Sequence, residues 1–275
     1  MNLAVEGVSF RYPSGVLALD NVNLSIGAGE AVAIVGENGA GKTTLARHFN
    51  GLLRPQAGVV RVGDWQTRDK TVAQLARRVG YVFQNPDDQL FARSVREEVA
   101  FGPRNLGWGE PGANEAVAAA LSLAGLTHAA DDHPYDLPVH ERKFVAIAAT
   151  LAMQTPVVIL DEPTTGLDAA GLSRVAAIIE ALKQRQVTVV TITHDLDFCG
   201  EHFQRLIVMS QGRIIADGPS EEVLRQVDVL RTAQVRPPML ISLALALGMP
   251  QAPCTVEEFI DAYRGHLGSW SDRSC

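Results

Sequence analysis

A glycine-rich loop near residue 40 carries the residue types that bind phosphate. Gly36 to Thr43 fits the pattern G-x-x-x-x-G-K-[ST], and it stands between an apolar run at 31–35 and a helix-like segment at 44–49. The backbone N–H groups of such a loop turn inward toward an anion, and the N-terminus of the next helix adds partial positive charge. Glycine at three of its positions lets the backbone approach phosphate without a side chain between them. The predicted nucleotide-binding residues of this segment are Gly36, Asn38, Gly39, Ala40, Gly41, Lys42, Thr43 and Thr44.

Four side chains have distinct expected tasks at this site. Lys42 would reach the β- and γ-phosphates of a nucleotide, and the Thr43 hydroxyl would bind Mg²⁺. The apolar run 157–160 leads into Asp161 and Glu162. A carboxylate at the end of a buried strand beside the strand of the loop can hold Mg²⁺, usually through water, and the next carboxylate can polarise an attacking water as a general base. We therefore expect Asp161 to hold the metal and Glu162 to act as the base.

The overall composition limits the classes of function. The chain has 275 residues and a net charge of −7, and its basic residues form no block, which argues against a general nucleic-acid surface. Its three cysteines, at 199, 254 and 275, match neither a disulfide framework nor a metal-binding spacing, which favours a reducing compartment. The N-terminus shows no secretion signal, and no apolar run reaches the roughly 20 residues that a membrane helix needs. We expect a soluble protein that can dock on a membrane partner.

The hydrophobic pattern predicts an α/β fold. Strands are expected at 3–10, 16–26, 31–35, 59–62 and 79–83, and again at 157–160, 187–193, 205–210 and 213–216. A helix is expected at 169–184, and the stretch 103–133 is typical of a helical insertion. Apolar strands that alternate with helices indicate a mainly parallel sheet covered on both faces. From residue 218 onward we expect a helical tail, broken at Pro237 and Pro238, with a capped last helix from Thr255.

Taken together, these motifs and their order resemble those of an ATP-binding cassette (ABC) ATPase, the motor subunit of a transporter. The resemblance covers about residues 2–230, which would form the nucleotide-binding domain with a helical subdomain at about 85–155. Residues 231–275 would form a C-terminal helical extension. The resemblance implies a P-loop NTPase core with a mainly parallel sheet, an N-terminal antiparallel β-subdomain, and ATP and Mg²⁺ as ligands.

The resemblance also assigns residues that would have ordinary structural explanations if each stood alone. Tyr12 matches the aromatic residue that stacks on adenine, and Gln84 matches a glutamine that can reach Mg²⁺ and senses the membrane subunit. The segment 164–168 matches a loop that crosses the dimer interface, and His194 matches the histidine that contacts the γ-phosphate. The implied catalytic set is then Glu162, His194 and Gln84, and the implied metal set is Thr43, Gln84 and Asp161.

One motif of the family is altered. The family's signature, Leu-Ser-Gly-Gly-Gln, corresponds here to Leu137-Pro138-Val139-His140-Glu141. In the family, the serine and the backbone amides of this segment bind the γ-phosphate of ATP held by the other subunit. Pro138 has no N–H to donate, and Val139 and His140 carry side chains where close backbone approach is needed. We therefore favour a heterodimer with a second ABC ATPase whose signature is intact; a homodimer with a relaxed signature is the alternative.

The segments 84–91 and 95–103 resemble those of energy-coupling factor (ECF) transporter ATPases, which power the import of vitamins or of metal ions such as cobalt and nickel. This implies a transmembrane coupling protein that docks near Gln84 to Phe91, where Asp87 and Asp88 would meet its arginines. It also implies a membrane substrate-binding subunit that chooses the cargo, no nucleic-acid partner, and a peripheral position at the cytoplasmic face of the cell membrane. The tail would help to pair the ATPases, or would pack on its own domain.

Two other classes of function account for less of the sequence. A soluble ABC ATPase of DNA repair or of ribosomes usually has long coiled coils or two cassettes in one chain, and this sequence has neither. A P-loop kinase would not explain Gln84, the Asp161–Glu162 pair, Asp168 and His194 together. The sequence does not name the cargo.

Overall fold

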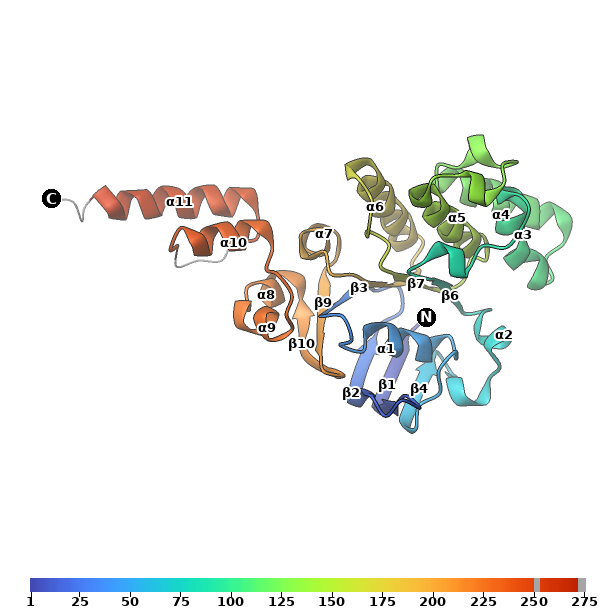
Figure 1. Ribbon diagram of the computed structural model, residues 1–275, viewed down its shortest axis with the longest axis horizontal. Coiled ribbons are helices and arrows are strands. Elements are labelled where there is room, and N and C mark those ends of the chain that lie inside the picture. The colour runs from blue at the N-terminus through green and yellow to red at the C-terminus, as the bar shows by residue number, and fades with distance from the viewer. Residues whose placement is uncertain (250–252, 272–275) are drawn as a thin grey trace.

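A six-stranded, mainly parallel sheet forms the centre of the protein (Figure 1). The computed structural model describes residues 1–249 and 253–271, with side chains up to residue 264. The strand order is β10-β9-β3-β8-β7-β6, and every neighbouring pair is parallel except β9 and β10. The strands are β3 (Ala31–Val35), β6 (Val79–Val82), β7 (Val157–Asp161), β8 (Thr188–Ile192), β9 (Arg205–Ser210) and β10 (Arg213–Pro219). The expected parallel sheet is thereby confirmed.

A second, antiparallel sheet lies against one face of this sheet and confirms the expected β-subdomain. Its order is β2-β1-β4-β5, with β1 (Leu3–Arg11), β2 (Leu17–Ile26), β4 (Ala57–Val62) and β5 (Trp65–Gln66). Helix α1 (Lys42–Phe49) packs between the two sheets, where Phe49 is fully buried. Because side chains of a strand alternate between faces, Val32 and Ile34 enter this core, whereas Ala33 and Val35 enter the core on the other face.

Helices cover the opposite face of the parallel sheet. They are α3 (Val95–Asn105), α4 (Glu110–Leu123), α5 (Val139–Ala152), α6 (Ala169–Gln184) and α7 (Leu196–His202), and a short α2 (Val72–Leu75) precedes β6. The sequence pattern predicted a helical stretch from residue 103, but helix α3 already starts at Val95. Ser94 caps it there by accepting a bond from the Glu97 N–H at 3.2 Å. Glu98, only 3% exposed, accepts the N–H groups of Phe91 and Ala92 and so anchors the loop that follows β6.

The C-terminal segment is helical, as expected. It contains α8 (Ser220–Leu224), α9 (Val227–Thr232), α10 (Met239–Ala246) and α11 (Val256–Ser271). Figure 1 shows α10 and α11 side by side and away from both sheets. Thr255 accepts the Glu258 N–H at 3.2 Å, which confirms the predicted cap, and Glu258 pairs with Arg225 at 2.9 Å. Cys275 lies outside the described residues, and none of the described helices is long and apolar enough to cross a membrane.

Candidate functional site

The carboxyl ends of four neighbouring parallel strands bring the sequence-predicted residues together. In sheet order, β3 leads to the glycine loop, β8 to His194, β7 to Asp161 and Glu162, and β6 to Gln84. This edge of an α/β sheet is where ligands bind in folds of this kind. One expectation is wrong: β7 does not lie beside β3, because β8 is inserted between them. The first turn of α1 spans that distance instead, since the Thr43 hydroxyl donates to Asp161 Oδ1 at 3.1 Å.

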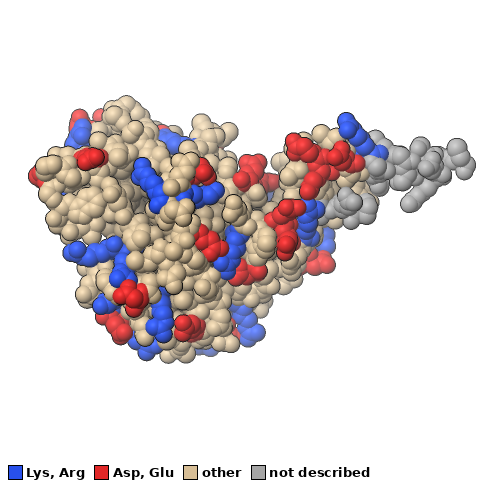
Figure 2. Space-filling model, turned by 180° about the vertical axis from the view of Figure 1, so that it is seen from behind, with Lys and Arg blue, Asp and Glu red and all other residues tan. Residues whose placement is uncertain are grey.

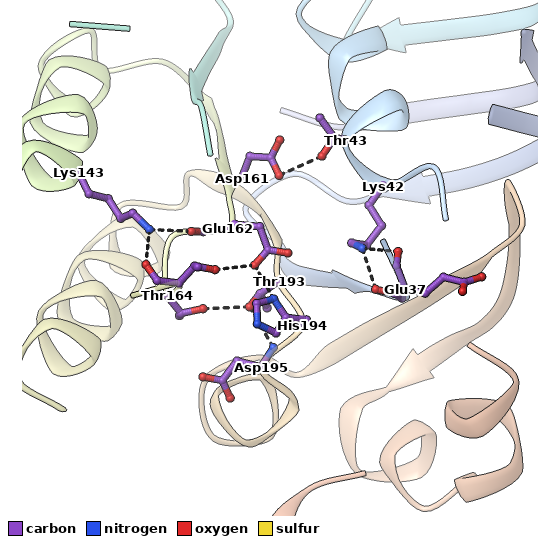
Figure 3. Close-up of polar contacts among 12 residues, drawn as sticks. Glu37, Lys42, Thr43, Lys143, Asp161, Glu162, Thr164, Thr193, His194 and Asp195 are labelled. Carbon is purple, nitrogen blue, oxygen red and sulfur yellow. Dashed lines mark hydrogen bonds and ion pairs between the residues drawn. The ribbon is translucent and has the colours of Figure 1, made fainter. Parts of the chain in front are cut away.

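The glycine loop wraps closely around its own lysine. Gly36 and Gly41 have φ values of 149° and 102°, and a Cβ on either would lie 2.1 Å from the Met209 carbonyl oxygen or 2.4 Å from that of Ala18. Lys42 Nζ donates to the carbonyl oxygens of Gly36 at 2.7 Å and Glu37 at 2.8 Å (Figure 3). Burial lowers the pKa of Lys42, and the nearby carboxylates, Glu162 foremost, oppose that shift.

Asp161 is a buried carboxylate with a separate hydrogen-bond partner on each oxygen. Its exposed fraction is 2%. Thr43 donates to Oδ1, and the Tyr81 hydroxyl donates to Oδ2 at 2.7 Å. A carboxylate beside a hydroxyl is the hard oxygen donor set that Mg²⁺ prefers, so Thr43 and Asp161 fit this metal.

Glu162, which follows β7, has hydrogen bonds to its backbone N–H, its carbonyl and its carboxylate (Figure 3). Its φ is 52°, a left-handed conformation that is uncommon outside glycine. Its N–H bonds to the Ile192 carbonyl at 2.8 Å, and its own carbonyl accepts from Lys143 Nζ at 3.1 Å. The carboxylate oxygen Oε2 is 2.9 Å from His194 Nδ1 and 3.1 Å from the Thr165 hydroxyl.

The glycine loop, the start of α1 and Glu162 border a cleft of about 270 Å³. Tyr12 lies at one wall, where its hydroxyl is 3.0 Å from the Thr44 hydroxyl, and Gln84 lies at another. The predicted residues that line the cleft are Tyr12, Asn38, Gly39, Gly41, Lys42, Thr43, Thr44, Gln84 and Glu162. Gly36, Ala40 and Asp161 are buried and do not line the cleft, and the His194 side chain, 63% exposed, is bonded to the lining residue Glu162. The structure therefore gathers the predicted residues around one cavity.

Known proteins resemble this chain in sequence and in fold. The family profile described as ABC transporter matches residues 19–165. The EcfA ATP-binding protein of the energy-coupling factor transporter in Methanothermobacter thermautotrophicus is 39% identical, over 93% of this chain and 84% of its own length. The chain belongs to the ABC transporter ATPases.

Two further relatives of this ABC ATPase match it over nearly their full length. The cobalt import ATP-binding protein CbiO of Rhodobacter capsulatus is 39% identical, over 98% of this chain and 99% of its own. The solved structure of cbiO1 from Clostridium perfringens, described as part of the ABC transporter complex cbiONQ, is 35% identical. It superposes with a TM-score of 0.76 and covers 90% of this chain and 98% of its own. The fold expected from the sequence is confirmed.

The altered signature segment of this ABC ATPase forms the start of α5. Pro138 is the N-cap, and its carbonyl accepts the N–H groups of Glu141 at 2.9 Å and Arg142 at 3.1 Å. The Val139 side chain is 66% exposed, whereas Glu141 turns inward and binds Arg174 of α6 through two bonds of 3.0 and 3.2 Å. The segment is thus an ordinary helix start, rigidly tied to α6, rather than a glycine turn.

Sequence reasoning missed Lys143, one turn further along α5. This lysine is 7% exposed and donates to the carbonyl oxygens of Glu162 and of Thr165, the latter at 2.6 Å. Burial lowers the pKa of Lys143, and the charge of Glu162 opposes the shift. The only signal was that basic residues follow the signature. The two bonds from Lys143 hold the main chain at the start and at the end of the loop 162–165.

We predict that Lys143→Met lowers kcat for ATP hydrolysis on the order of 10- to 100-fold, because the strained Glu162 conformation loses a support and its carboxylate loses alignment. The ATP dissociation constant should change by less than about threefold, since Lys143 is not among the residues that line the cleft. Lys183→Met is the matched control, because within the described part of the chain the Lys183 ammonium pairs with its helix neighbour Glu180 at 2.9 Å. Equal kcat values for the two variants would contradict the role given to Lys143.

Proposed function

We propose that this protein is the ATP-hydrolysing subunit of an energy-coupling factor importer, powering uptake of a vitamin or of a transition-metal ion such as cobalt. The observation that carries the proposal is the cleft itself. It is bordered by the glycine loop and by Thr43, whose hydroxyl is bonded to Asp161, and by Glu162, whose carboxylate is bonded to His194. The names of the relatives, an energy-coupling factor ATPase and a cobalt importer ATPase, supply the transport class.

In this proposal, the loop and α1 hold the nucleotide. Tyr12, at the wall of the cleft, stacks on adenine, and the loop amides bind the phosphates. The Lys42 ammonium, which here binds two loop carbonyls, turns to the β- and γ-phosphates. Thr43, Asp161 and Gln84 hold Mg²⁺, which when bound neutralises charge on the phosphate oxygens.

Glu162 and His194 carry out the hydrolytic step. Glu162 accepts a proton from the attacking water, and His194, joined to its carboxylate at 2.9 Å, contacts the γ-phosphate. The left-handed backbone at Glu162 supports this assignment, because strained conformations of this kind are concentrated at active sites.

We expect Glu162→Gln to bind ATP normally and to lose hydrolysis by about 10² to 10⁴-fold, because the amide cannot take the proton. The variant should remain trapped as a closed dimer with ATP, as size-exclusion chromatography would show. Lys42→Ala is the contrasting variant: its ATP affinity should fall roughly tenfold or more through the loss of charge-assisted bonds. Wild-type turnover by Glu162→Gln would refute the assignment of the base.

We further propose a dimer in which each ATP lies between one glycine loop and the facing signature segment. ATP then stabilises the closed state, because its γ-phosphate gains contacts from both halves. In this chain, Pro138 has no N–H to donate, and Val139 and His140 carry side chains where close backbone approach is needed. The site that this chain offers to its partner's ATP is therefore weak, which favours a heterodimer.

Restoring the signature tests this asymmetry. In transporters reconstituted with this ATPase alone, the triple variant Pro138→Ser, Val139→Gly and His140→Gly should hydrolyse ATP at least about tenfold faster than wild type, since each lost bond to a charged phosphate is worth about 1.5–3 kcal/mol. Adding a second ATPase with an intact signature should raise the wild-type rate in the same way. Full activity of the unmodified homodimer would show that no such partner is needed.

The loop after β6 is the proposed docking surface for a transmembrane coupling protein. Phe91 and Phe101 form an edge-to-face pair with ring centroids 4.7 Å apart, and they are 61% and 49% exposed. Asp87 has a half-exposed carboxylate that binds Arg142 at 3.3 Å, so an incoming arginine would share or replace that bond. Exposed aromatic rings beside carboxylates suit a partner helix that carries both apolar and basic side chains.

This assembly places the protein at the cytoplasmic face of the membrane, with a separate membrane subunit that binds the cargo. On the face shown in Figure 2, the described Lys and Arg side chains are interspersed with Asp and Glu, and they form no broad basic field. That distribution agrees with a protein partner rather than a nucleic acid.

Affinity purification of the tagged chain from its own membranes, in mild detergent, tests the transport assignment. We expect an integral membrane coupling protein, a second ABC ATPase and a cargo-binding membrane subunit to co-purify. Recovery only with ribosomal or DNA-bound proteins would overturn the assignment and leave the ATPase activity standing.

A further inference from the structure

Tyr81 links strand β6 to the carboxylate that the proposed function gives to the metal. It pairs in parallel register with Ile159 of β7, two residues before Asp161. Because residues two apart on a strand face the same side of a sheet, the Tyr81 ring extends along that face and its hydroxyl reaches Asp161 Oδ2 at 2.7 Å. The contact is buried, since Tyr81 is 8% exposed and Asp161 2%.

The direction of this hydrogen bond is fixed. The Tyr81 hydroxyl donates and the carboxylate accepts, because an ionised carboxylate has no hydrogen to give. A protonated phenol beside a carboxylate donates, and such charge-assisted bonds are short and strong. The bond also supplies a donor that an ionised, buried carboxylate requires.

Each oxygen of Asp161 therefore has its own partner. Tyr81 occupies Oδ2 from the side of β6, and Oδ1 is turned to Thr43 at the start of α1. A carboxylate without the Tyr81 bond is free to rotate and to present either oxygen at varying angles. With the bond in place, one oxygen is held beside the Thr43 hydroxyl, which is the arrangement that a shared metal ion needs.

We propose that Tyr81 is a positioning residue for the metal site: its hydroxyl holds the Asp161 carboxylate so that Oδ1 faces Thr43 and the bound cation. The role rests on the proposed function, because Thr43 and Asp161 are its metal ligands. Partners of this kind, one shell outside a metal, typically change metal affinity 10- to 100-fold when they are removed.

The test separates metal binding from nucleotide binding. The dissociation constant of a fluorescent, non-hydrolysable ATP analogue is measured in EDTA and at a series of free Mn²⁺ concentrations, with wild type and Tyr81→Phe. Tyr81→Phe removes only the hydroxyl and keeps the ring, whose centroid in the wild type lies 4.9 Å from that of Phe83. We expect the half-saturating Mn²⁺ concentration to rise about tenfold, with affinity in EDTA within about twofold of wild type.

Two controls decide the outcome. Tyr135→Phe removes a hydroxyl that donates to the Leu90 carbonyl at 3.1 Å, away from the metal ligands, and should leave the Mn²⁺ dependence unchanged. Asp161→Asn should abolish that dependence. If Asp161→Asn abolishes it and Tyr81→Phe keeps it, the role of Tyr81 is wrong. If neither variant changes it, the proposed metal site fails, and the inference fails with it. Equal losses in EDTA and in Mn²⁺ would mean that the hydroxyl serves folding and not the metal.

Discussion

The parallel hydrogen-bond ladder between β7 and β8 is the constraint on which the site depends. The ladder pairs Asp161 with Ile192 and continues one residue further, because the Glu162 N–H still bonds to the Ile192 carbonyl. The chain must then leave the sheet at Glu162, and it does so through a left-handed turn. Asp161 is thereby fixed in the sheet and Glu162 at its rim, so that adjacent carboxylates meet different partners. The two roles proposed for these carboxylates, metal ligand and general base, therefore follow from where the ladder ends.

Helix α5 depends on that turn and faces two ways. Its first turn contains the altered signature segment, with Val139 exposed to solvent, while Lys143 in its second turn reaches back to the Glu162 carbonyl. The outward face lost the glycines that close approach to a phosphate requires. The inward face makes contacts within the chain, where Glu141 pairs with Arg174 and ties α5 to α6. Opposite faces of a helix contact different elements, so the exposed face of α5 can lack the family's signature residues while its buried face still supports Glu162.

The sequence predicted the parts of the site that are contiguous in the chain. The loop at 36–43 and the pair Asp161–Glu162 each follow an apolar run, so their motif and their strand were readable together. The insertion of β8 between β3 and β7 was not predictable, since strand order depends on packing and leaves no trace in spacing. Tyr81 and Lys143 were missed for a related reason. A tyrosine in a strand and a lysine in a helix are ordinary residues until the fold brings them to Asp161 and Glu162.

The charges of the cleft show why these supporting residues matter. Two buried lysines, Lys42 and Lys143, lie near two buried carboxylates, Asp161 and Glu162, and burial lowers the pKa of each lysine. Each lysine compensates for its lost hydration by donating to backbone carbonyl oxygens. At Lys42 these carbonyls belong to the glycine loop, and a phosphate can replace them. At Lys143 they belong to the 162–165 loop, and the bonds are structural. The carboxylates repel an incoming triphosphate unless a cation balances them. Tyr81 donates to the Asp161 carboxylate, and Lys143 donates to the carbonyl oxygens of Glu162 and Thr165. Neither residue lines the cleft, so both can support the site without occupying the space proposed for nucleotide and metal.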